Sequence, residues 1–426
     1  MSLIVKAGKA GKRVLKKFMP EQPRHVSYTR RIECVKTSQR VVAMTFDDGP
    51  MDLPAVPDKF SGRSLTDILL DTLQEYDAKG TFDVIGDTGE NYPDTAGRSG
   101  QADWGGVRYD HYPDINQDER GGVVHNERLM HRIIDEGHQV TNHGYRHIIF
   151  GKKPFVYGKR EYLKSVDEAV EDLTRLHRLL REKYGYEMTM GRPPHYVDKM
   201  AGGFSSYDVY DQMEYLYLAA SFDGAGWLPI THGSARETMN AEIGAMVEPM
   251  RKALEEDPNA LCGQIIFQKD GYNMARRTPV AFGLAKQLEL LRKYGYRVVT
   301  VEELMAESPF ADVGREEPGF EKLVRLQKSR GIVYSDNRLR LDQPITWGEI
   351  AMLLAPRKEA VQRRVKQMKA TGAYQHIHWG AMDWCAEQGI LKYAMNPDEA
   401  SKSLPEGYFD PVRSLTRREV YQAFRG

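Results

Sequence analysis

Short apolar runs alternate with longer amphipathic stretches through most of the chain. Apolar runs bounded by glycine, proline or polar residues predict buried strands, and apolar residues spaced three or four apart predict helices. Strands are expected over 41–44, 80–86, 137–142, 216–222, 264–267 and 297–301, and helices over 65–76, 127–136, 159–183, 241–255 and 280–294. This alternation predicts an α/β fold with a largely parallel sheet, which we expect to close as a (β/α) barrel.

Four other segments do not follow the alternation. Residues 1–37 form a basic polar leader, and residues from about 94 to 124 are rich in Gly, Asp, Tyr and Asn without periodicity. We interpret the second segment as an insertion near a site rather than a core element. The barrel domain is expected over 38–306, followed by a linker over 307–317 and a small all-helical domain over 318–426.

Two copies of one helical unit are expected within the C-terminal domain, over 318–355 and 378–424. Each copy contains a helix that ends at a glycine, a loop, and a second helix that opens with Thr-x-x-Glu, a capping box. A single helix pair cannot bury its apolar face, so we expect the two copies to pack together.

Composition narrows the function classes. The 426 residues contain 60 Lys and Arg and 60 Asp and Glu, so net charge gives no argument for nucleic acid as a partner. No apolar run reaches the ~20 residues of a membrane helix. The basic N-terminus lacks the apolar segment of a signal peptide, and is expected to be a solvated leader. The alternative is an amphipathic segment lying on an anionic membrane.

Two adjacent carboxylates, Asp47 and Asp48, stand at the end of the predicted strand 41–44 and are followed by Gly-Pro. Glycine permits a sharp turn and proline cannot donate to a sheet ladder, so the strand is expected to end here. Two like charges beside a buried sheet are costly unless a cation or a chemical task retains them. Because strand side chains alternate between faces, the two can take different roles. The alternative is a solvated turn, and this segment alone does not decide between them.

His143 and His147 lie just past the predicted strand 137–142. Their spacing lets both imidazoles converge on one ion when the turn between them is helical. Such a pair alone is more often incidental, but Asp47 and Asp48 are expected at another strand end of the same sheet. Two histidines and one carboxylate leave an open coordination position, the catalytic arrangement in which a metal activates water. The second aspartate is then free to act as a general base.

These segments resemble the motifs of the polysaccharide deacetylase family (NodB-homology domain). Residues 45–50 match its first motif, residues 136–147 its second, and residues 80–86 and 300–304 its framework. The resemblance covers about residues 38–306. It implies a distorted (β/α) barrel that removes acetyl groups from N-acetylated sugars with the help of a metal.

By that resemblance, Asp47 is the catalytic base, while Asp48, His143 and His147 bind a divalent metal. Zinc is expected, with cobalt or manganese as alternatives. Arg192 opens a segment similar to the third motif, and would hold the base aspartate by a salt bridge.

Residues 222–227 are similar to the fourth motif. By the resemblance, Asp223 would tether Arg192 and Trp227 would line the substrate groove. Without the family, Arg192 would be interpreted as a surface ion pair and Trp227 as a core residue.

The third motif departs from the family at His195 and Tyr196, where an aromatic residue and glycine are usual. The backbone N–H of His195 can still help to bind the oxyanion, and its ring adds a titratable group. Pro194 and Tyr196 are expected to contact the substrate together with Trp227.

The fifth motif departs more strongly, because Lys269 replaces the histidine that protonates the leaving amine in the family. A lysine can donate a proton only if its pKa falls well below ~10.4, which burial and a nearby metal would favour. Otherwise Lys269 would be a fixed cation that stabilises the oxyanion. His195 is an alternative acid. A further alternative is that the acid is lost and the site is slow or inactive.

The C-terminal copies resemble S-layer homology repeats, which attach bacterial surface proteins to cell-wall polymers. The second copy contains Thr416-Arg-Arg-Glu419, while the first has Trp347 where the ligand-binding arginine would stand. Three repeats usually complete a wall-binding unit, and this chain has two. The alternative is a packing appendage that stabilises the barrel.

We therefore expect an enzyme, a metal-dependent polysaccharide N-acetyl deacetylase, whose partner is a polysaccharide of the bacterial cell wall. The alternatives are a catalytically impaired glycan-binding protein and an esterase that removes O-acetyl groups. Two features of the sequence predict different locations: the repeats suggest the cell surface, and the missing signal peptide suggests the cytoplasm.

Overall fold

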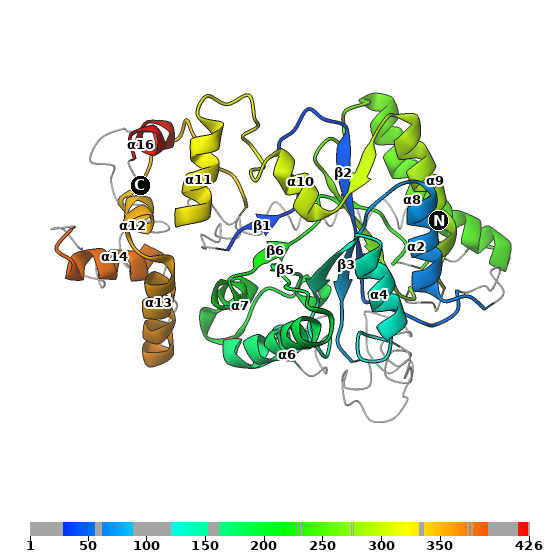
Figure 1. Cartoon of the computed structure of the whole chain (residues 1–426), viewed down its shortest axis with the longest axis horizontal. Helices are drawn as coiled ribbons and strands as arrows, with labels where there is room; N and C mark the ends of the chain where they lie inside the picture. Colours follow the sequence, from blue (N-terminus) through cyan, green and yellow to red (C-terminus); the bar gives the residue numbers. More distant parts are fainter. Residues whose placement is uncertain are drawn as a thin grey trace, which may run out of the picture.

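A nine-stranded parallel sheet forms the centre of the protein (Figure 1). The structure is a computed structural model that describes residues 29–55, 62–87, 121–151, 162–227, 229–230, 232–273, 275, 277–331, 336–372, 375, 378–390 and 416–424. The strand order is β1-β6-β5-β4-β3-β2-β8-β7, and β9 also pairs with β2. The strands are β1 (Arg31–Ile32), β2 (Val41–Asp47), β3 (Thr81–Val84), β4 (Gln139–Asn142), β5 (Met190–Gly191), β6 (Leu216–Leu218), β7 (Phe222–Asp223), β8 (Ile265–Lys269) and β9 (Arg297–Val299).

The sheet curls, so that its two ends approach each other. Cys34, just after β1, forms a bridge with Gln264, just before β8, and the Val35 N–H donates to the Gly263 carbonyl over 2.9 Å. Within the described residues, no ladder joins β1 to β7, so the sheet is a curled half-barrel rather than a closed ring. The predicted α/β class and parallel sheet are confirmed at this level.

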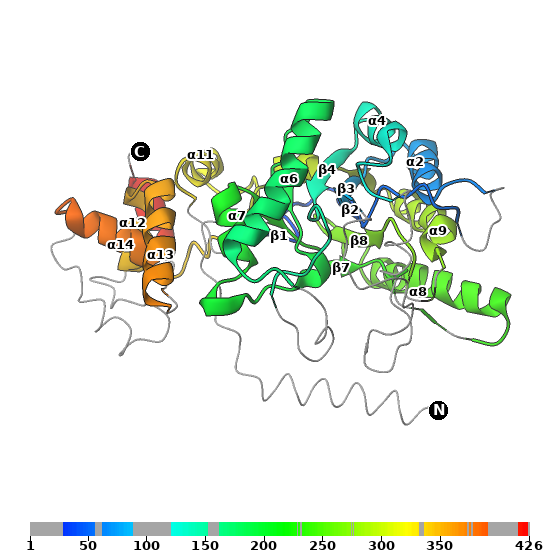
Figure 2. The same ribbon diagram turned by 90° about the horizontal axis from the view of Figure 1, so that it is seen from below.

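Helices surround the sheet on its outer side (Figures 1 and 2). They are α2 (Leu65–Glu75), α4 (Glu127–Asp135), α6 (Val166–Tyr184), α7 (Ser206–Met213), α8 (Ala235–Glu256), α9 (Pro279–Lys293) and α10 (Val301–Glu307). All seven residues of β2 are buried, which explains its continuous apolar run between neighbouring parallel strands. Because β2, β3 and β4 are parallel neighbours, their C-terminal ends meet at one edge of the sheet. Functional sites of parallel sheets lie at this edge.

The predicted elements differ from the structure at several boundaries. The strand expected over 216–222 is two strands, β6 and β7. Helix α6 begins at Val166, because the Ser165 side chain accepts a hydrogen bond from the Glu168 N–H and caps it there. Strand β1 lies inside the segment predicted as a leader, and most of the predicted insertion lies outside the described residues.

The C-terminal helices are α11 (Phe320–Arg330), α12 (Trp347–Leu354), α13 (Arg357–Thr371), α14 (His378–Glu387) and α16 (Arg417–Ala423). Both predicted capping boxes are present, at the N-termini of α12 and α16. The segment before the first cap also pairs with the second cap, through a bridge between Pro344 and Thr416. The copies therefore pack together as predicted, while the likeness to S-layer homology repeats and the wall attachment that it implies stay a prediction.

A buried ion pair connects these two capping boxes. Arg417 stands at the position that Trp347 occupies in the first copy, and its side chain is fully buried. Its guanidinium donates to both carboxylate oxygens of Glu349, over 2.6 and 3.1 Å. Arg417 therefore joins the two copies to each other.

The C-terminal helices lie beside the part of the barrel that contains α7 (Figures 1 and 2). Arg364 of α13 pairs with Asp208 of α7, and both side chains are buried. Arg30, just before β1, donates to the Pro309 carbonyl over 2.5 Å. The segment predicted as a linker therefore packs on the barrel, and its Phe310 is fully buried.

Glu349→Ala is expected to destabilise the C-terminal helices more than Glu419→Ala. Both changes remove the acidic N3 residue of a capping box, a feature worth about 1 kcal/mol. Only the first leaves the buried Arg417 without its carboxylate, which costs about 3–5 kcal/mol. Urea unfolding measures both variants, and equal losses of unfolding free energy would contradict this role of the pair.

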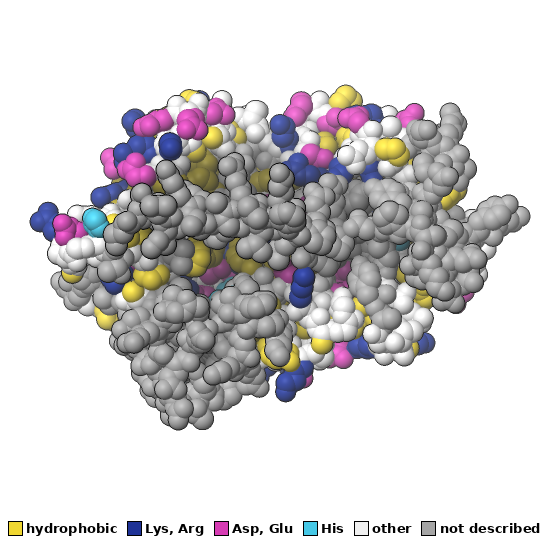
Figure 3. All heavy atoms as spheres, turned by 180° about the vertical axis from the view of Figure 1, so that it is seen from behind, with side chains coloured by type: hydrophobic (Ala, Val, Ile, Leu, Met, Phe, Trp, Pro, Cys, Tyr) yellow, Lys and Arg dark blue, Asp and Glu magenta, His cyan; other side chains and the backbone are white. Residues whose placement is uncertain are grey.

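Within the described residues, no helix combines the length and apolar character needed to span a bilayer. Acidic and basic side chains lie intermixed along the upper edge of the face shown in Figure 3. This mixture agrees with the equal numbers of both charges in the sequence.

Candidate metal centre and active site

Asp47 and Asp48 separate at the end of β2. Asp47 is the last residue of the strand, whereas Asp48 lies beyond it with a φ of 81°. This left-handed conformation is uncommon for a non-glycine residue, although aspartate tolerates it better than most. The two carboxylates therefore diverge because the backbone turns at Asp48, not because of the strand alternation expected from the sequence. Both side chains are almost completely buried.

His143 and His147 lie in the loop after β4, and both are buried. The loop is not the helical turn considered from the sequence, since Gly144 and His147 have φ values of 89° and 54°. The two rings nevertheless lie side by side, with their centroids 4.8 Å apart.

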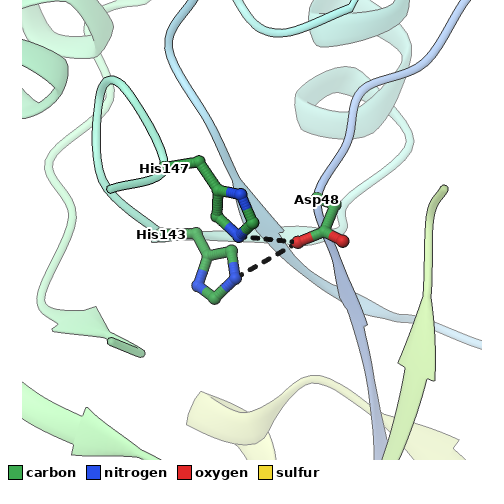
Figure 4. A group of neighbouring side chains, drawn as sticks. All are labelled: Asp48, His143 and His147. Atoms are coloured by element: carbon green, nitrogen blue, oxygen red, sulfur yellow. Dashed lines mark ion pairs between the residues drawn. The ribbon is translucent and has the colours of Figure 1, made fainter. Parts of the chain in front are cut away.

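Asp48, His143 and His147 form one group (Figure 4). The Oδ1 atom of Asp48 lies 3.3 Å from Nε2 of His143 and 3.1 Å from Nε2 of His147. One ligand atom of each residue lies within 4.8 Å of the others. A carboxylate oxygen and two imidazole nitrogens are the donor set of divalent transition metals such as zinc, and three protein ligands leave a position open. The three residues therefore fit a metal of this class.

Asp83 of β3 lies at the Nδ1 side of the His143 ring, opposite the nitrogen that faces Asp48. Its Oδ2 atom lies 2.9 Å from Nδ1 of His143, and the Arg192 carbonyl oxygen lies 2.9 Å from the same nitrogen. The hydrogen bond to the Arg192 carbonyl and the adjacent Asp83 carboxylate favour a proton on Nδ1 and leave Nε2 to face Asp48, the arrangement that fixes metal-binding histidines. Although burial alone would lower it, the pKa of His143 is raised by the Asp83 carboxylate. Burial, with the neighbouring His143, holds the pKa of His147 well below its usual value.

Arg192 holds Asp47. Its side chain is fully buried just after β5, and its Nη1 donates to Oδ1 of Asp47. Further donations go to the Thr45 hydroxyl over 3.1 Å and to the Ala219 carbonyl over 3.3 Å. Burial raises the pKa of Asp47, and the guanidinium of Arg192 opposes that rise. The other oxygen, Oδ2, lies 3.9 Å from Nε2 of His143, on the side of the metal group.

Lys269, the last residue of β8, lies beside Asp47 in the sheet register. Its Nζ donates to Oδ2 of Asp48, while the two histidines face Oδ1. The ammonium therefore lies at the edge of the metal group. Burial lowers the pKa of Lys269 to about 8, and Asp47 and Asp270 oppose the change.

His195 of the third motif lies beside the same group, and Tyr196 lies beside Arg192. The ring of His195 lies 5.2 Å from that of His147, between centroids, and both His195 and Tyr196 have positive φ values. The centre of the Tyr196 ring lies 5.4 Å from the Arg192 guanidinium carbon, and Pro194 is buried. His195 is thus near enough to the metal group to remain an alternative acid.

Asp223, the last residue of β7, pairs with Trp227. The carboxylate of Asp223 accepts from the Trp227 indole N–H at 3.2 Å and from the Ala225 N–H at 2.9 Å. Arg192 instead donates to Asp47, Thr45 and two backbone carbonyls. The tether expected between Asp223 and Arg192 is therefore replaced by one between Asp223 and Trp227.

Asp83 was predicted only as part of the framework segment 80–86, with no functional role. One signal could have found it, because a charged residue in the middle of a four-residue buried strand needs a partner. Its partners are His143 and the Thr141 hydroxyl, which donates to Oδ1 over 2.6 Å.

The family model described as "Polysaccharide deacetylase" matches residues 35–197 of this chain. This segment contains Asp47, Asp48, His143, His147 and Arg192, and the match supports a domain of that family here.

Among curated proteins, the chain is similar to a peptidoglycan-N-acetylglucosamine deacetylase of Bacillus cereus. The two are 26% identical over 271 residues, covering 64% of this chain and 91% of the relative. The peptidoglycan-N-acetylmuramic acid deacetylase PdaC of Bacillus subtilis is 26% identical over 180 residues, but the match spans only 27% of PdaC and 42% of this chain. Among solved structures, the chitin deacetylase of Colletotrichum lindemuthianum aligns with a TM-score of 0.41 and 19% identity, over 66% of this chain and 94% of that chain.

Proposed function

We propose that the protein is a metal-dependent hydrolase that removes acetyl groups from N-acetylated amino sugars of a polysaccharide, with bacterial peptidoglycan as its substrate. The deacetylase family match and the named activities of the relatives support the class and the substrate. The location at the cell wall that such a substrate requires is part of the same proposal.

The proposal rests chiefly on one observation: the neighbouring carboxylates of Asp47 and Asp48 have different partners. Asp48 faces the two histidine nitrogens, while Asp47 is bound through one oxygen by Arg192 and directs the other toward the same group. Two buried neighbouring carboxylates thus have different partners, which is how one site obtains a ligand and a base.

A divalent metal held by Asp48, His143 and His147 would supply Lewis-acid activation of water and of the acetyl carbonyl. Asp47 accepts a proton from the water as the water oxygen bonds to the carbonyl carbon. Arg192 keeps the Asp47 carboxylate in place, and Nδ1 of His143 keeps its proton, which is directed at the Arg192 carbonyl beside the Asp83 carboxylate.

The leaving nitrogen must receive a proton as its bond to the carbonyl carbon breaks. The products are then acetate and the free amine of the sugar. We assign the donation to Lys269, whose pKa burial lowers to about 8, so that its ammonium is a far better acid than an exposed lysine.

Removal of metal is expected to abolish acetate release. Chelator treatment of the purified protein, followed by zinc, cobalt or manganese, should remove and then restore acetate release from N-acetylated chitin oligomers or peptidoglycan. The reason is that Asp47 alone cannot activate water enough to attack an amide. Full activity after the chelator has removed all bound metal would contradict the proposal.

The same assay separates the alternative functions. Faster acetate release from O-acetylated xylan than from any N-acetyl substrate would favour the esterase. Stoichiometric metal binding without acetate release from either substrate class would favour a glycan-binding protein.

A further inference from the structure

A buried carboxylate outside the metal group, Asp172, contacts the loop that carries both histidines. Asp172 lies in the middle of α6, and its side chain is 3% exposed. Its Oδ2 accepts from the backbone N–H of Tyr145 over 2.8 Å and from that of Arg146 over 3.5 Å. Its Oδ1 accepts from Nε of Arg146 over 2.7 Å.

The opposite side of this loop is bound by the end of β3. The Gly86 N–H donates to the carbonyls of Gly144 and Tyr145, over 3.3 and 3.0 Å, and the Asp87 N–H donates to Tyr145 over 2.9 Å. The carbonyls of Gly144 and Tyr145 therefore face the segment after β3, whereas the N–H groups of Tyr145 and Arg146 face α6. Successive N–H groups directed at one point form a small anion-binding concavity, which Asp172 fills.

The loop needs such support because it is not helical. In a helical turn, backbone hydrogen bonds would hold residues 143 and 147 on one face. Here Gly144 and His147 are both in the left-handed region, which an unsupported histidine rarely adopts. A ring contact adds to the support, since the Arg175 guanidinium lies 3.7 Å from the centre of the Tyr145 ring.

We propose that Asp172 is a positioning residue of the metal centre, which holds the loop 143–147 so that both imidazoles face Asp48. The proposal rests on the proposed function, because the group that it positions is the metal group. It assigns to α6 the orientation of two ligands that α6 itself does not carry.

Metal affinity tests this role directly. Asp172→Asn keeps the size of the side chain but loses the charge that binds the two N–H groups, and Asp172→Ala removes both. Groups that hydrogen-bond directly to metal ligands typically contribute about 10- to 100-fold in affinity. Asp172 acts through the backbone between the two ligands, so we expect zinc affinity, measured by competition with a chelating dye, to fall by about 10-fold, the lower end of that range, in both variants. The absorption spectrum of the cobalt form should also change, and saturating metal should recover part of the lost kcat.

Asp67→Asn is the matched control. Asp67 is a carboxylate of α2 that pairs with Arg128 and Arg132 of α4, and it has no contact with the loop. This variant is expected to lose stability but to keep the zinc affinity and cobalt spectrum of the parent. Should Asp172→Ala fail to fold, Asp172→Asn supplies the measurement.

The outcomes separate this inference from the proposed function. Unchanged zinc affinity in a folded Asp172 variant, or an equal loss in Asp67→Asn, would overturn the positioning role while leaving metal-dependent deacetylation intact. A parent protein that binds no zinc or cobalt would instead overturn the proposed function.

Discussion

Asp47→Asn is expected to reduce kcat for acetate release about 10²- to 10⁴-fold, the usual contribution of a general base, while metal stays bound. An amide cannot accept the proton that the Asp47 carboxylate takes from water. The asparagine oxygen can still accept from Arg192, so the fully buried guanidinium keeps a partner and the fold is retained. Steady-state acetate release and metal content of the purified variant check both halves of the expectation.

Asp48→Asn gives the contrasting result. Asp48 contacts both histidine nitrogens and Lys269, so its loss should remove metal and activity together. Turnover by Asp47→Asn at the rate of the parent would contradict the assignment of the base. Loss of metal from Asp47→Asn but not from Asp48→Asn would show that the two roles are exchanged.

The sequence predicted the members of this centre better than their geometry. Local patterns made Asp47, Asp48, His143 and His147 candidates without deciding their roles, and the resemblance to a deacetylase family assigned them. The separation of Asp47 from Asp48 depends on a left-handed residue after β2. No pattern of apolar and polar residues encodes that turn.

Contacts between distant segments were the other missing part. Asp83 contacts His143 from 60 positions away, and its role follows only from the register of β3 beside β4. The two-residue strands β1 and β5 also escaped prediction, since their pairing with β6 rather than their own residues makes them strands. Helices α2, α4 and α9 and the buried strands β2, β3 and β4 were predicted to within a few residues because periodicity within one segment defines them, whereas α13, between the two predicted copies, was not predicted.

Lys269→Met is the second substitution with a large expected effect. Methionine has a similar length but carries neither a charge nor a proton. We expect kcat to fall at least about 10²-fold if Lys269 is the general acid. Metal affinity should not fall, because the ammonium donates to the same carboxylate that faces the histidines and competes with a cation for its charge.

Two further variants separate a proton donor from a fixed cation. Lys269→Arg keeps the positive charge, but a guanidinium is too weak an acid to release its proton, because its pKa lies well above that of an ammonium. It should therefore remain nearly as slow as Lys269→Met if donation matters, and recover if charge alone matters. Lys269→His keeps a titratable donor and is expected to be the least damaging of the three.

The pH profile gives the same distinction independently. An acid must be protonated to act, so kcat of the parent should fall as pH rises through the pKa of Lys269. Burial places that pKa at about 8, and a bound cation would lower it further. This descending limb should be absent in Lys269→Arg. His195 lies beside His147 and is the competing donor, so His195→Gln is the decisive comparison. If His195→Gln loses more activity than Lys269→Met and removes the descending limb, the proton comes from His195, and Lys269 serves only to hold Asp48.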